Sequence, residues 1–452
     1  MQYSIVQKAQ LEGALRLDAE YYQPEYLNLL RILTRKPHDY LKNLSNRISR
    51  GKQPIYKENG NIFAFTSDQI RNDFIDTYSA RYTDEKFYKK NPKAQVKPLD
   101  VLLNSTGVGT LGRVNFYYLE KKAVVDGHIT IIRTISENLD PIFLNVFLKT
   151  KYGQFQITRA YSGSSGQIEL YPEQIREFLI FLPPLEIQKR IAETIKQAIS
   201  LYKQSESLYS QAEDLLLEEL GLRDFKVEDD LFYVVNLSEI KSAHRADAEY
   251  FQPKYEKLIK CMKKNVEIQE LKTITTTKRG SLIDPRFYNE TEGTPYIRGK
   301  DFSSGRLEKS GLVYISRDFR SKNETRVNSG DLVFALIGTM GTSALVTKEF
   351  DHSFISNNVG KISIKNKKEI LPEYLSIVLN SIVGKLQFEK EASQTAQPKI
   401  SDFQVRNFKI PILPKPTQQK IADLVQQSHE ARKKAKQLLD KAKRKVEELI
   451  KK

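Results

Sequence analysis

Residues 182–222 read LPPLEIQKRIAETIKQAISLYKQSESLYSQAEDLLLEELGL, and the stretch predicts one long helix. Two prolines stand at its start, where the first backbone N–H groups of a helix lack partners. Gly221 stands at its end, where a residue that tolerates left-handed geometry often ends a helix. Between them, small and apolar residues recur at alternating spacings of four and three: Ile191, Ile195, Ala198, Tyr202, Ser205, Tyr209, Ala212 and Leu216. This heptad seam is too long and too narrow for an ordinary surface helix, so it predicts a partner helix.

An internal duplication surrounds this stretch. The sequence RLDAEYYQPEY begins at Arg16 and RADAEYFQPKY begins at Arg245, with eight of eleven positions identical at a constant offset of 229 residues. Arg50-Gly51 recurs as Arg279-Gly280, LDVLLNS recurs as GDLVFAL, and GSSGQIELY recurs as SQTAQPKIS. Such self-similarity predicts two copies of one structural unit, each a mixed α/β globular region followed by a long helix.

The duplication supplies the partner helix at the far end of the chain. The seam spacing recurs there at Ile421, Leu424, Ser428, Ala431, Ala435, Leu438, Ala442, Lys445 and Leu449. Two copies related by internal symmetry would place the helices antiparallel. The alternative is that each helix packs only on its own globular half. The predicted organisation is a first globular region 1–181, a central helix 182–222, a link 223–230, a second globular region 231–413 and a C-terminal helix 414–452.

The composition favours a polyanionic partner. Lysine and arginine number 72 against 56 acidic residues, a net charge of +16, which suits nucleic acid first and an anionic membrane surface second. A solvated basic surface without such a partner is the alternative. Cys261 is the only cysteine, which excludes a disulfide framework and fits a reducing cytoplasm. With no signal-peptide core and no apolar run of membrane-spanning length, we expect a soluble cytoplasmic protein.

Motifs that could carry catalysis are weak. Residues 107–112 match GxGxxG, but strand-like RVNFYYL follows where a dinucleotide site needs a helix. Residues 126–128 read DGH, which suggests a catalytic base, yet the second repeat has NNV at 357–359. No two histidines show metal-ligand spacing. We therefore expect neither a catalytic residue nor a metal site in this chain.

Polar loop residues between the predicted strands suit the recognition of DNA. Arginine and lysine pair with guanine, asparagine and glutamine pair with adenine, and further cations bind phosphates. A loop hydrogen bond or a solvated charge explains any one of these residues, so only the set carries weight. The candidates in the first repeat are Arg50, Lys52, Gln69, Arg71, Ser105, Arg113, His128, Ser164 and Gln167. The candidates in the second repeat are Arg279, Arg298, Lys300, Thr339, Asn357, Asn358, Gln394, Gln397 and Lys399.

Taken together, these segments resemble the specificity (S) subunit of type I restriction–modification enzymes. The resemblance rests on RLDAEYYQP and RADAEYFQP, on GSSGQIEL and SQTAQPKI, and above all on LPPLEIQKRIAETI and LPKPTQQKIADLV. It covers essentially the whole chain. Pro414-Lys415-Pro416 departs from the double proline of the first copy, which puts the capping of the second helix in doubt but not the architecture.

The resemblance implies an α+β fold with two mixed α/β target-recognition domains, related by the internal repeat, and two long helices in an antiparallel coiled coil. Each domain would read one half of a bipartite double-stranded DNA sequence, and the helices would set the spacer. The implied partners are two modification subunits, which bind S-adenosylmethionine and methylate adenine, and restriction (motor–nuclease) subunits. The chain itself would hold no cofactor. The alternatives are a stand-alone nucleic-acid-binding repeat protein and a coiled-coil interaction scaffold without enzyme partners.

Overall fold

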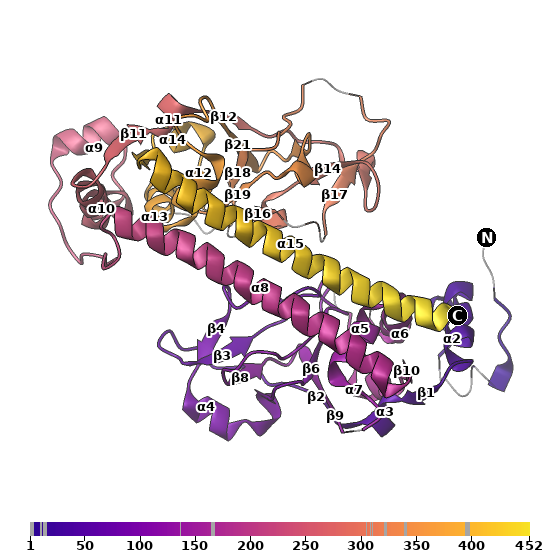
Figure 1. Cartoon of the computed structure of the whole chain (residues 1–452). Coiled ribbons are helices and arrows are strands. Elements are labelled where there is room, and N and C mark those ends of the chain that lie inside the picture. The colour runs from indigo at the N-terminus through magenta and orange to yellow at the C-terminus, as the bar shows by residue number, and fades with distance from the viewer. Residues whose placement is uncertain are drawn as a thin grey trace. The chain divides into compact units, whose positions relative to one another are not determined.

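The chain forms two compact units, each of which contains one repeat and parts of both long helices. Unit 1 comprises Met1–Lys203 with Ala431–Lys452, and unit 2 comprises Gln204–Glu430. The computed structural model describes residues 4–9, 11, 16–135, 137–163, 168–303, 305–307, 309, 311–320, 323–338, 341–393 and 398–452. The long helices are α8 (Leu185–Glu219) and α15 (Lys415–Lys451), magenta and yellow in Figure 1. Each of them begins in one unit and ends in the other.

Unit 1 is built on a four-stranded antiparallel central sheet with the order β2-β9-β6-β7. Its strands are β2 (Ser45–Arg50), β6 (Val101–Asn104), β7 (Val114–Phe116) and β9 (Ile129–Thr134). A second sheet has the order β4-β3-β8-β5, from β3 (Ile62–Phe65), β4 (Arg81–Thr83), β5 (Gln95–Val96) and β8 (Ala123–Val125). β1 (His38–Tyr40) pairs with β10 (Leu179–Phe181). The helices are η1 (Ala19–Tyr22), α2 (Pro24–Thr34), α3 (Leu41–Leu44), α4 (Glu85–Lys90), η2 (Pro92–Ala94), α5 (Pro141–Lys149), α6 (Lys151–Ala160) and α7 (Pro172–Arg176).

Unit 2 repeats this plan. Its central sheet has the order β12-β21-β18-β19, from β12 (Thr275–Arg279), β18 (Leu332–Ala335), β19 (Ser343–Leu345) and β21 (Val359–Ile364). Its second sheet has the order β13-β17-β14-β20, from β13 (Tyr288–Asn289), β14 (Thr294–Ile297), β17 (Val313–Ile315) and β20 (Phe354–Ile355). Two strand pairs stand beside them: β11 (Glu267–Glu270) with β22 (Lys409–Ile412), and β15 (Phe302–Ser303) with β16 (Arg306–Leu307). The helices are α9 (Leu237–Ala243), η3 (Ala248–Phe251), α10 (Pro253–Lys263), α11 (Leu271–Ile274), η4 (Pro285–Phe287), η5 (Gly299–Asp301), η6 (Lys348–Phe350), α12 (Pro372–Asn380), α13 (Ile382–Glu391) and α14 (Asp402–Val405).

The matching sheet orders confirm the predicted duplication and the α+β fold class. Both second sheets contain one parallel pair formed by an early and a later strand, β3 with β8 in unit 1 and β14 with β20 in unit 2. The apolar runs VLLN and LVFA, which the repeat alignment paired, form β6 and β18. All eight of their residues are buried, as expected for inner strands covered on both faces.

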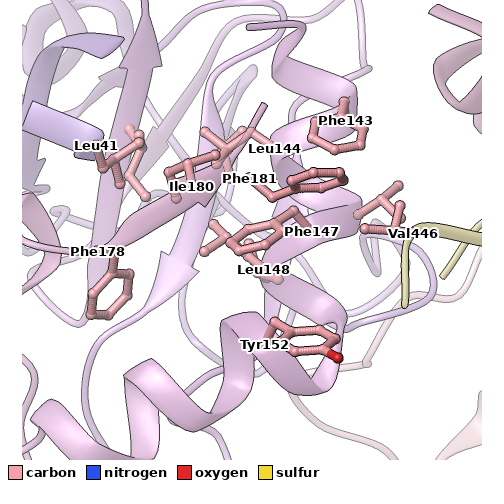
Figure 2. Close-up of a cluster of buried hydrophobic side chains, with 14 of the residues drawn as sticks. Leu41, Phe143, Leu144, Phe147, Leu148, Tyr152, Phe178, Ile180, Phe181 and Val446 are labelled. Carbon is pink, nitrogen blue, oxygen red and sulfur yellow. The ribbon is translucent and has the colours of Figure 1, made fainter. Parts of the chain in front are cut away.

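The core of unit 1 lies between the central sheet, α5 and the long helices. Asp140 caps α5, since its carboxylate accepts hydrogen bonds from the backbone N–H groups of Ile142 and Phe143. Proline at the first position and the apolar sequence PIFLNVFLK then make α5 a buried helix. Figure 2 shows Phe143 and Phe147 of α5 near Val446 of α15, within one apolar cluster. The C-terminal part of α15 is therefore part of the core of the first repeat.

Within each unit the two long helices pack antiparallel. In unit 1, Ile191 and Ile195 from the start of α8 share an apolar cluster with Val446 and Ile450 from the end of α15. In unit 2, Leu216 from the end of α8 shares a cluster with Ile421 from the start of α15. The same clusters contain residues of the globular regions, so each helix half packs on both a helix and a sheet domain.

The buried stripe differs from the predicted seam in detail. Eleven of the seventeen predicted seam residues are buried: Ile191, Ile195, Ala198, Ser205, Ala212, Leu216, Ile421, Ser428, Ala431, Ala435 and Ala442. Five are partly buried: Tyr202, Tyr209, Leu424, Leu438 and Leu449. Toward the end of α15 the buried positions are Val446 and Ile450, whereas Lys445 is exposed. The stripe follows the 3.6-residue period of a helix that also covers a globular core, which makes it wider than a two-helix seam. Among the described residues, no helix combines the length and apolarity that a membrane span requires.

Candidate nucleic-acid interface

Four strand ends of the central sheet of unit 1 meet at one end of that sheet. β2 ends at Arg50 opposite Thr130, and β6 ends at Asn104 opposite Ile129. Backbone hydrogen bonds continue past the strands, from Ser105 N to the His128 carbonyl oxygen at 2.8 Å. Because neighbouring strands are antiparallel, the residues after β2 and β6 and those before β9 and β7 lie together. We call this group the strand-end site. Its predicted DNA readers are Arg50, Lys52, Ser105, Arg113 and His128.

The Arg-Gly pair that recurs in both repeats has a steric reason at this site. After Arg50 the chain runs against the end of β8, and a Cβ atom on Gly51 would lie 2.2 Å from the Val125 carbonyl oxygen. A Cβ atom on Gly280 would lie 2.1 Å from the Ser356 carbonyl oxygen in unit 2. Neither approach is possible for a residue with a side chain. Glycine is therefore required in both copies.

Two of the predicted readers in unit 1 hold the site together. The Arg50 guanidinium contacts the Glu169 carboxylate at 2.5 Å, donates to the Leu170 carbonyl oxygen at 3.1 Å and lies over the Tyr171 ring. The hydrogen bond from Tyr171 and then that from Arg50 lower the pKa of Glu169. Ser105 is fully buried, with its hydroxyl 2.5 Å from that of Thr130. The structural partners Glu169 and Tyr171 were not among the sequence candidates.

The other three readers present polar groups. Lys52 and His128 are exposed, and the Thr106 hydroxyl lies 2.6 Å from Nδ1 of His128. Arg113 is half-buried. Burial and then the neighbouring Arg71 guanidinium lower the pKa of Arg113, and Asp68 and Asp73 only partly oppose this. Cations gathered in this way favour a bound anion, and phosphate is one that fits.

The loop between β3 and β4, residues 66–80, lies against the same end of the sheet. Asn104 donates to the Ser67 carbonyl oxygen at 2.7 Å, and Asn115 donates to that of Arg71 at 2.9 Å. Gln69 is buried and organises the loop through hydrogen bonds to Thr66 and Ser79. Arg71 pairs with Asp76 at 2.7 Å while 40% of its side chain stays exposed. Arg71 can thus contact a ligand, whereas Gln69 shapes the loop.

Unit 2 places its candidates at the equivalent strand ends. Arg279 is exposed at the end of β12 and donates to the Asn357 carbonyl oxygen at 2.6 Å. Asn358 is exposed immediately before β21, where unit 1 has His128. Asn357 is half-buried, and Lys300 is exposed. Arg298 is held in an ion pair with Asp301 at 2.9 Å and donates to the Gly311 carbonyl oxygen.

One charge is reversed between the two sites. Backbone pairing matches Thr106 with Glu169 in unit 1 and Ile337 with Lys399 in unit 2, so Lys399 occupies the position of Glu169. Unit 1 therefore has an Arg50–Glu169 ion pair where unit 2 has the two exposed cations Arg279 and Lys399. Ser164, Gln167, Thr339, Gln394 and Gln397 lie outside the described residues. Within the described part of the chain, no group of three or more His, Cys, Asp or Glu residues could hold a metal ion.

Comparison with protein family models shows to which family the chain belongs. Residues 43–210 and 263–443 match the family model described as "Type I restriction modification DNA specificity domain". The two matches cover more than half of the chain, one in each repeat. The chain belongs to this family. Each strand-end site falls within one matched specificity domain. The function of this chain is therefore DNA recognition.

Solved structures similar to this specificity chain include two S subunits. The type I restriction-modification S subunit from M. genitalium is 13% identical, with 92% of this chain and 95% of that chain covered and a TM-score of 0.41. The HsdS subunit from Thermoanaerobacter tengcongensis is 13% identical, with the same coverage and a TM-score of 0.30. A chain from a study of type I R-M complex assembly is 16% identical, with 90% and 97% covered and a TM-score of 0.29. The search of curated proteins finds no match.

Proposed function

We propose that this chain is the sequence-specific DNA-binding subunit of a type I restriction–modification complex and that each repeat reads one half of a bipartite target. One observation carries the proposal. Both strand-end sites have the same backbone, yet they present different side chains, His128 against Asn358 and Glu169 against Lys399. Two sites that share a backbone arrangement but differ in their side chains are suited to reading two different base sequences.

The two kinds of contact have separate roles in this proposal. Exposed side chains such as His128 and Asn358 select bases, because their ring nitrogens and amide groups match base edges in the major groove. Exposed cations such as Lys52 and Lys300 bind phosphates and position the subunit without reading sequence. The net charge of +16 makes affinity fall as salt rises, through release of counterions. The paired long helices fix the number of unread base pairs between the half-sites.

Catalysis belongs to partner subunits in this proposal. Two modification subunits bind S-adenosylmethionine and methylate an adenine in each half-site, which they reach by flipping the base out of the duplex. Restriction subunits supply the motor and nuclease. The duplication supports two modification subunits, since two copies of one fold offer two equivalent attachment surfaces to one kind of partner. This chain contributes recognition and assembly.

Methylome sequencing of the source cell tests the proposal. We expect an adenine-methylated motif with two specified halves and a spacer of constant length, which disappears when this gene is disrupted. A tagged full-length chain should also co-purify with an adenine methyltransferase. A tagged chain that binds DNA by sequence but recruits no methyltransferase would instead indicate a stand-alone nucleic-acid-binding repeat protein. An interaction scaffold predicts no sequence-dependent DNA binding at moderate salt, and either result overturns the proposal.

A further inference from the structure

In both units, the segment that follows the parallel-paired strand of the second sheet reaches the long helices. β3 ends at Phe65 and β14 ends at Ile297, and the two strands occupy equivalent places in their sheets. Phe74 and Arg306 each stand nine residues after these ends. We call residues 66–74 and residues 298–303 with 305–307 the docking segments. Sequence reasoning missed both end residues, because loops have no periodic pattern.

The docking segment of unit 1 contacts α8 and α15 through a stacked ring. Phe74 is buried, and its ring lies parallel to that of Tyr202 of α8, with centroids 3.9 Å apart and planes at 7°. The Arg432 guanidinium of α15 lies 5.0 Å from the centre of the Tyr202 ring. Asp73 pairs with Lys436 of α15 at 3.6 Å. Two neighbouring residues of one loop therefore bind both helices.

The docking segment of unit 2 contacts the same two helices through a guanidinium. Arg306 is 9% exposed, and its Nη1 lies 2.5 Å from the Glu206 carboxylate of α8. Its Nη2 donates to the Ser428 hydroxyl of α15 at 2.9 Å. The guanidinium also lies 4.8 Å from the centre of the Tyr209 ring. Tyr209 stands one heptad after Tyr202 on α8, so both segments use a tyrosine of the same helix stripe.

Arg306 reaches a polar layer between the helices. The Ser428 hydroxyl donates to the Ser205 carbonyl oxygen at 2.7 Å, and both hydroxyl groups are buried 3.1 Å apart. A buried polar layer in a helix pair fixes the register, because sliding one helix leaves these groups without partners. Arg306 thus binds the helices at a point where hydrogen bonds fix their register.

Each docking segment is also attached to its central sheet. Gly305 N donates to the Ser343 carbonyl oxygen of β19 at 2.9 Å, and a Cβ atom on Gly305 would lie 2.3 Å from the Tyr209 hydroxyl oxygen. With φ at +82°, glycine is the residue that fits this close approach. In unit 1 the bonds from Asn104 and Asn115 to residues 67 and 71 serve the same purpose. Each segment therefore links a strand-end site to the helix pair.

We propose that Phe74 and Arg306 are positioning residues that set the orientation of each strand-end site on the helices, and so restrict the spacer length the protein accepts. This inference rests on the proposed function. Candidate readers Arg71 and Lys300 lie on the same segments as the two anchors. Apolar packing alone is non-directional, whereas a bidentate guanidinium and a stacked ring prefer one orientation. Loss of an anchor lets the recognition region rock on the helices while its reading side chains stay unchanged.

Methylome sequencing of cells that carry Arg306→Ala or Phe74→Ala in the full-length chain tests this inference. We expect unchanged half-sites, together with methylation of sites whose spacer is one base pair shorter or longer. The preference for the original spacer should fall by at least about tenfold, equivalent to about 1.4 kcal/mol of discrimination. Lys254→Ala is the matched control, because Lys254 is a buried cation of unit 2 whose ion pairs run to Asp229 and Glu389. We expect this control to lower stability without new spacers.

Milder variants keep the inference falsifiable where Arg306→Ala abolishes all methylation. Ser428→Ala removes one partner of Arg306, and Arg306→Lys keeps the charge but loses the two-pronged geometry. Either should relax the spacer by a smaller factor. If all four variants still methylate the wild-type motif with a single spacer length, this inference is overturned and the proposed function stands. A wild-type cell without any bipartite motif overturns the proposed function and the inference with it.

Discussion

The central sheets of the two repeats are alike, whereas their second sheets differ. Both central sheets have four antiparallel strands in the same order. The second sheets share a three-stranded core, β4-β3-β8 in unit 1 and β17-β14-β20 in unit 2, but their fourth strands differ: β5 extends unit 1 beside β8, whereas β13 extends unit 2 beside β17. Unit 2 also carries the β15–β16 pair that bears Arg306. The difference teaches that the central sheets, which share apolar clusters with the long helices, keep their topology, while the second sheets and the docking segments accept changes in strand pairing and length.

Even the shared sheets reach the same packing with different residues. Leu103 pairs with Thr130 across β6 and β9, and the equivalent pair in unit 2 is Phe334 with Gly360. A Cβ atom on Gly360 would lie 2.2 Å from the Phe334 ring, so the ring occupies the space that a threonine side chain fills in unit 1. The β18 residue is larger than its β6 counterpart and the β21 residue is smaller than its β9 counterpart, so the volume gained on one strand offsets volume lost on the other.

The strongest test of the comparison replaces one recognition region. Substituting residues 50–170 by the equivalent region of another family member should replace one half of the methylated motif entirely. The other half and the spacer should stay unchanged, because unit 2 and its helix contacts are retained. Methylome sequencing reads out all three features. A change in both halves would show that the repeats do not read independently.

Placing the unit 1 threonine at position 360 should disrupt the packing of the Phe334–Gly360 pair in unit 2. Gly360→Thr places a side chain against the Phe334 ring and should destabilise unit 2 by about 1–3 kcal/mol, the usual effect of overpacking. The double variant Phe334→Leu with Gly360→Thr recreates the unit 1 pair and should recover at least about half of that loss. Urea unfolding of the full-length variants measures both. No recovery in the double variant would contradict the volume exchange.

Reversing the charge of Lys399 tests the difference between the two strand-end sites directly. Lys399→Glu gives Arg279 the acidic neighbour that Arg50 has in Glu169, which removes positive charge from the unit 2 site. Affinity for target DNA should fall about tenfold at low salt, with a shallower salt dependence because fewer counterions are released. Glu169→Lys is the reciprocal variant and should destabilise unit 1, since it leaves Arg50 without its partner. Fluorescence anisotropy against salt concentration and thermal unfolding distinguish the two effects.

The smallest expected effect concerns Asp73 in the docking segment of unit 1. Burial opposes its ionisation, but Lys436, Arg432, the hydrogen bond from the Phe74 backbone N–H and Arg71 together outweigh burial and lower the pKa of Asp73 below its ordinary 3.8. A lowered folded-state pKa adds stability above the unfolded value, and that stability is lost as pH falls through the folded value. Asp73→Asn should therefore lower the melting temperature at pH 7, with a difference that shrinks below about pH 4. Exposed Glu193, mutated to Gln, should show no such trend.

Patterns that repeat along the sequence were sufficient to predict the fold. The heptad spacing predicted a helix over 182–222, and α8 spans Leu185–Glu219. The offset of 229 residues predicted two copies, and the sheet orders agree. These signals succeed because periodic burial and self-similarity are properties of the chain itself.

The site was less predictable, since a residue type in a loop does not reveal its partners. Arg50 and Arg279 share one Arg-Gly motif, yet Arg50 is paired with Glu169 and Arg279 is exposed. The difference arises at Lys399, which is distant in sequence and adjacent only in the fold. Phe74 and Arg306 are unlike in chemistry, so no alignment of the repeats by residue identity would pair them. The two residues are paired only by their equal number of residues after the ends of the matching strands β3 and β14.

Because each long helix is shared between units, the order in which the units can be completed during synthesis is the reverse of their order in the chain. The core of unit 1 includes Ala442, Val446 and Ile450, so it stays open until these residues have left the ribosome. Unit 2 ends at Glu430 and can close earlier. The first repeat must therefore wait with apolar surface exposed, which makes it the part of the nascent chain most dependent on chaperones.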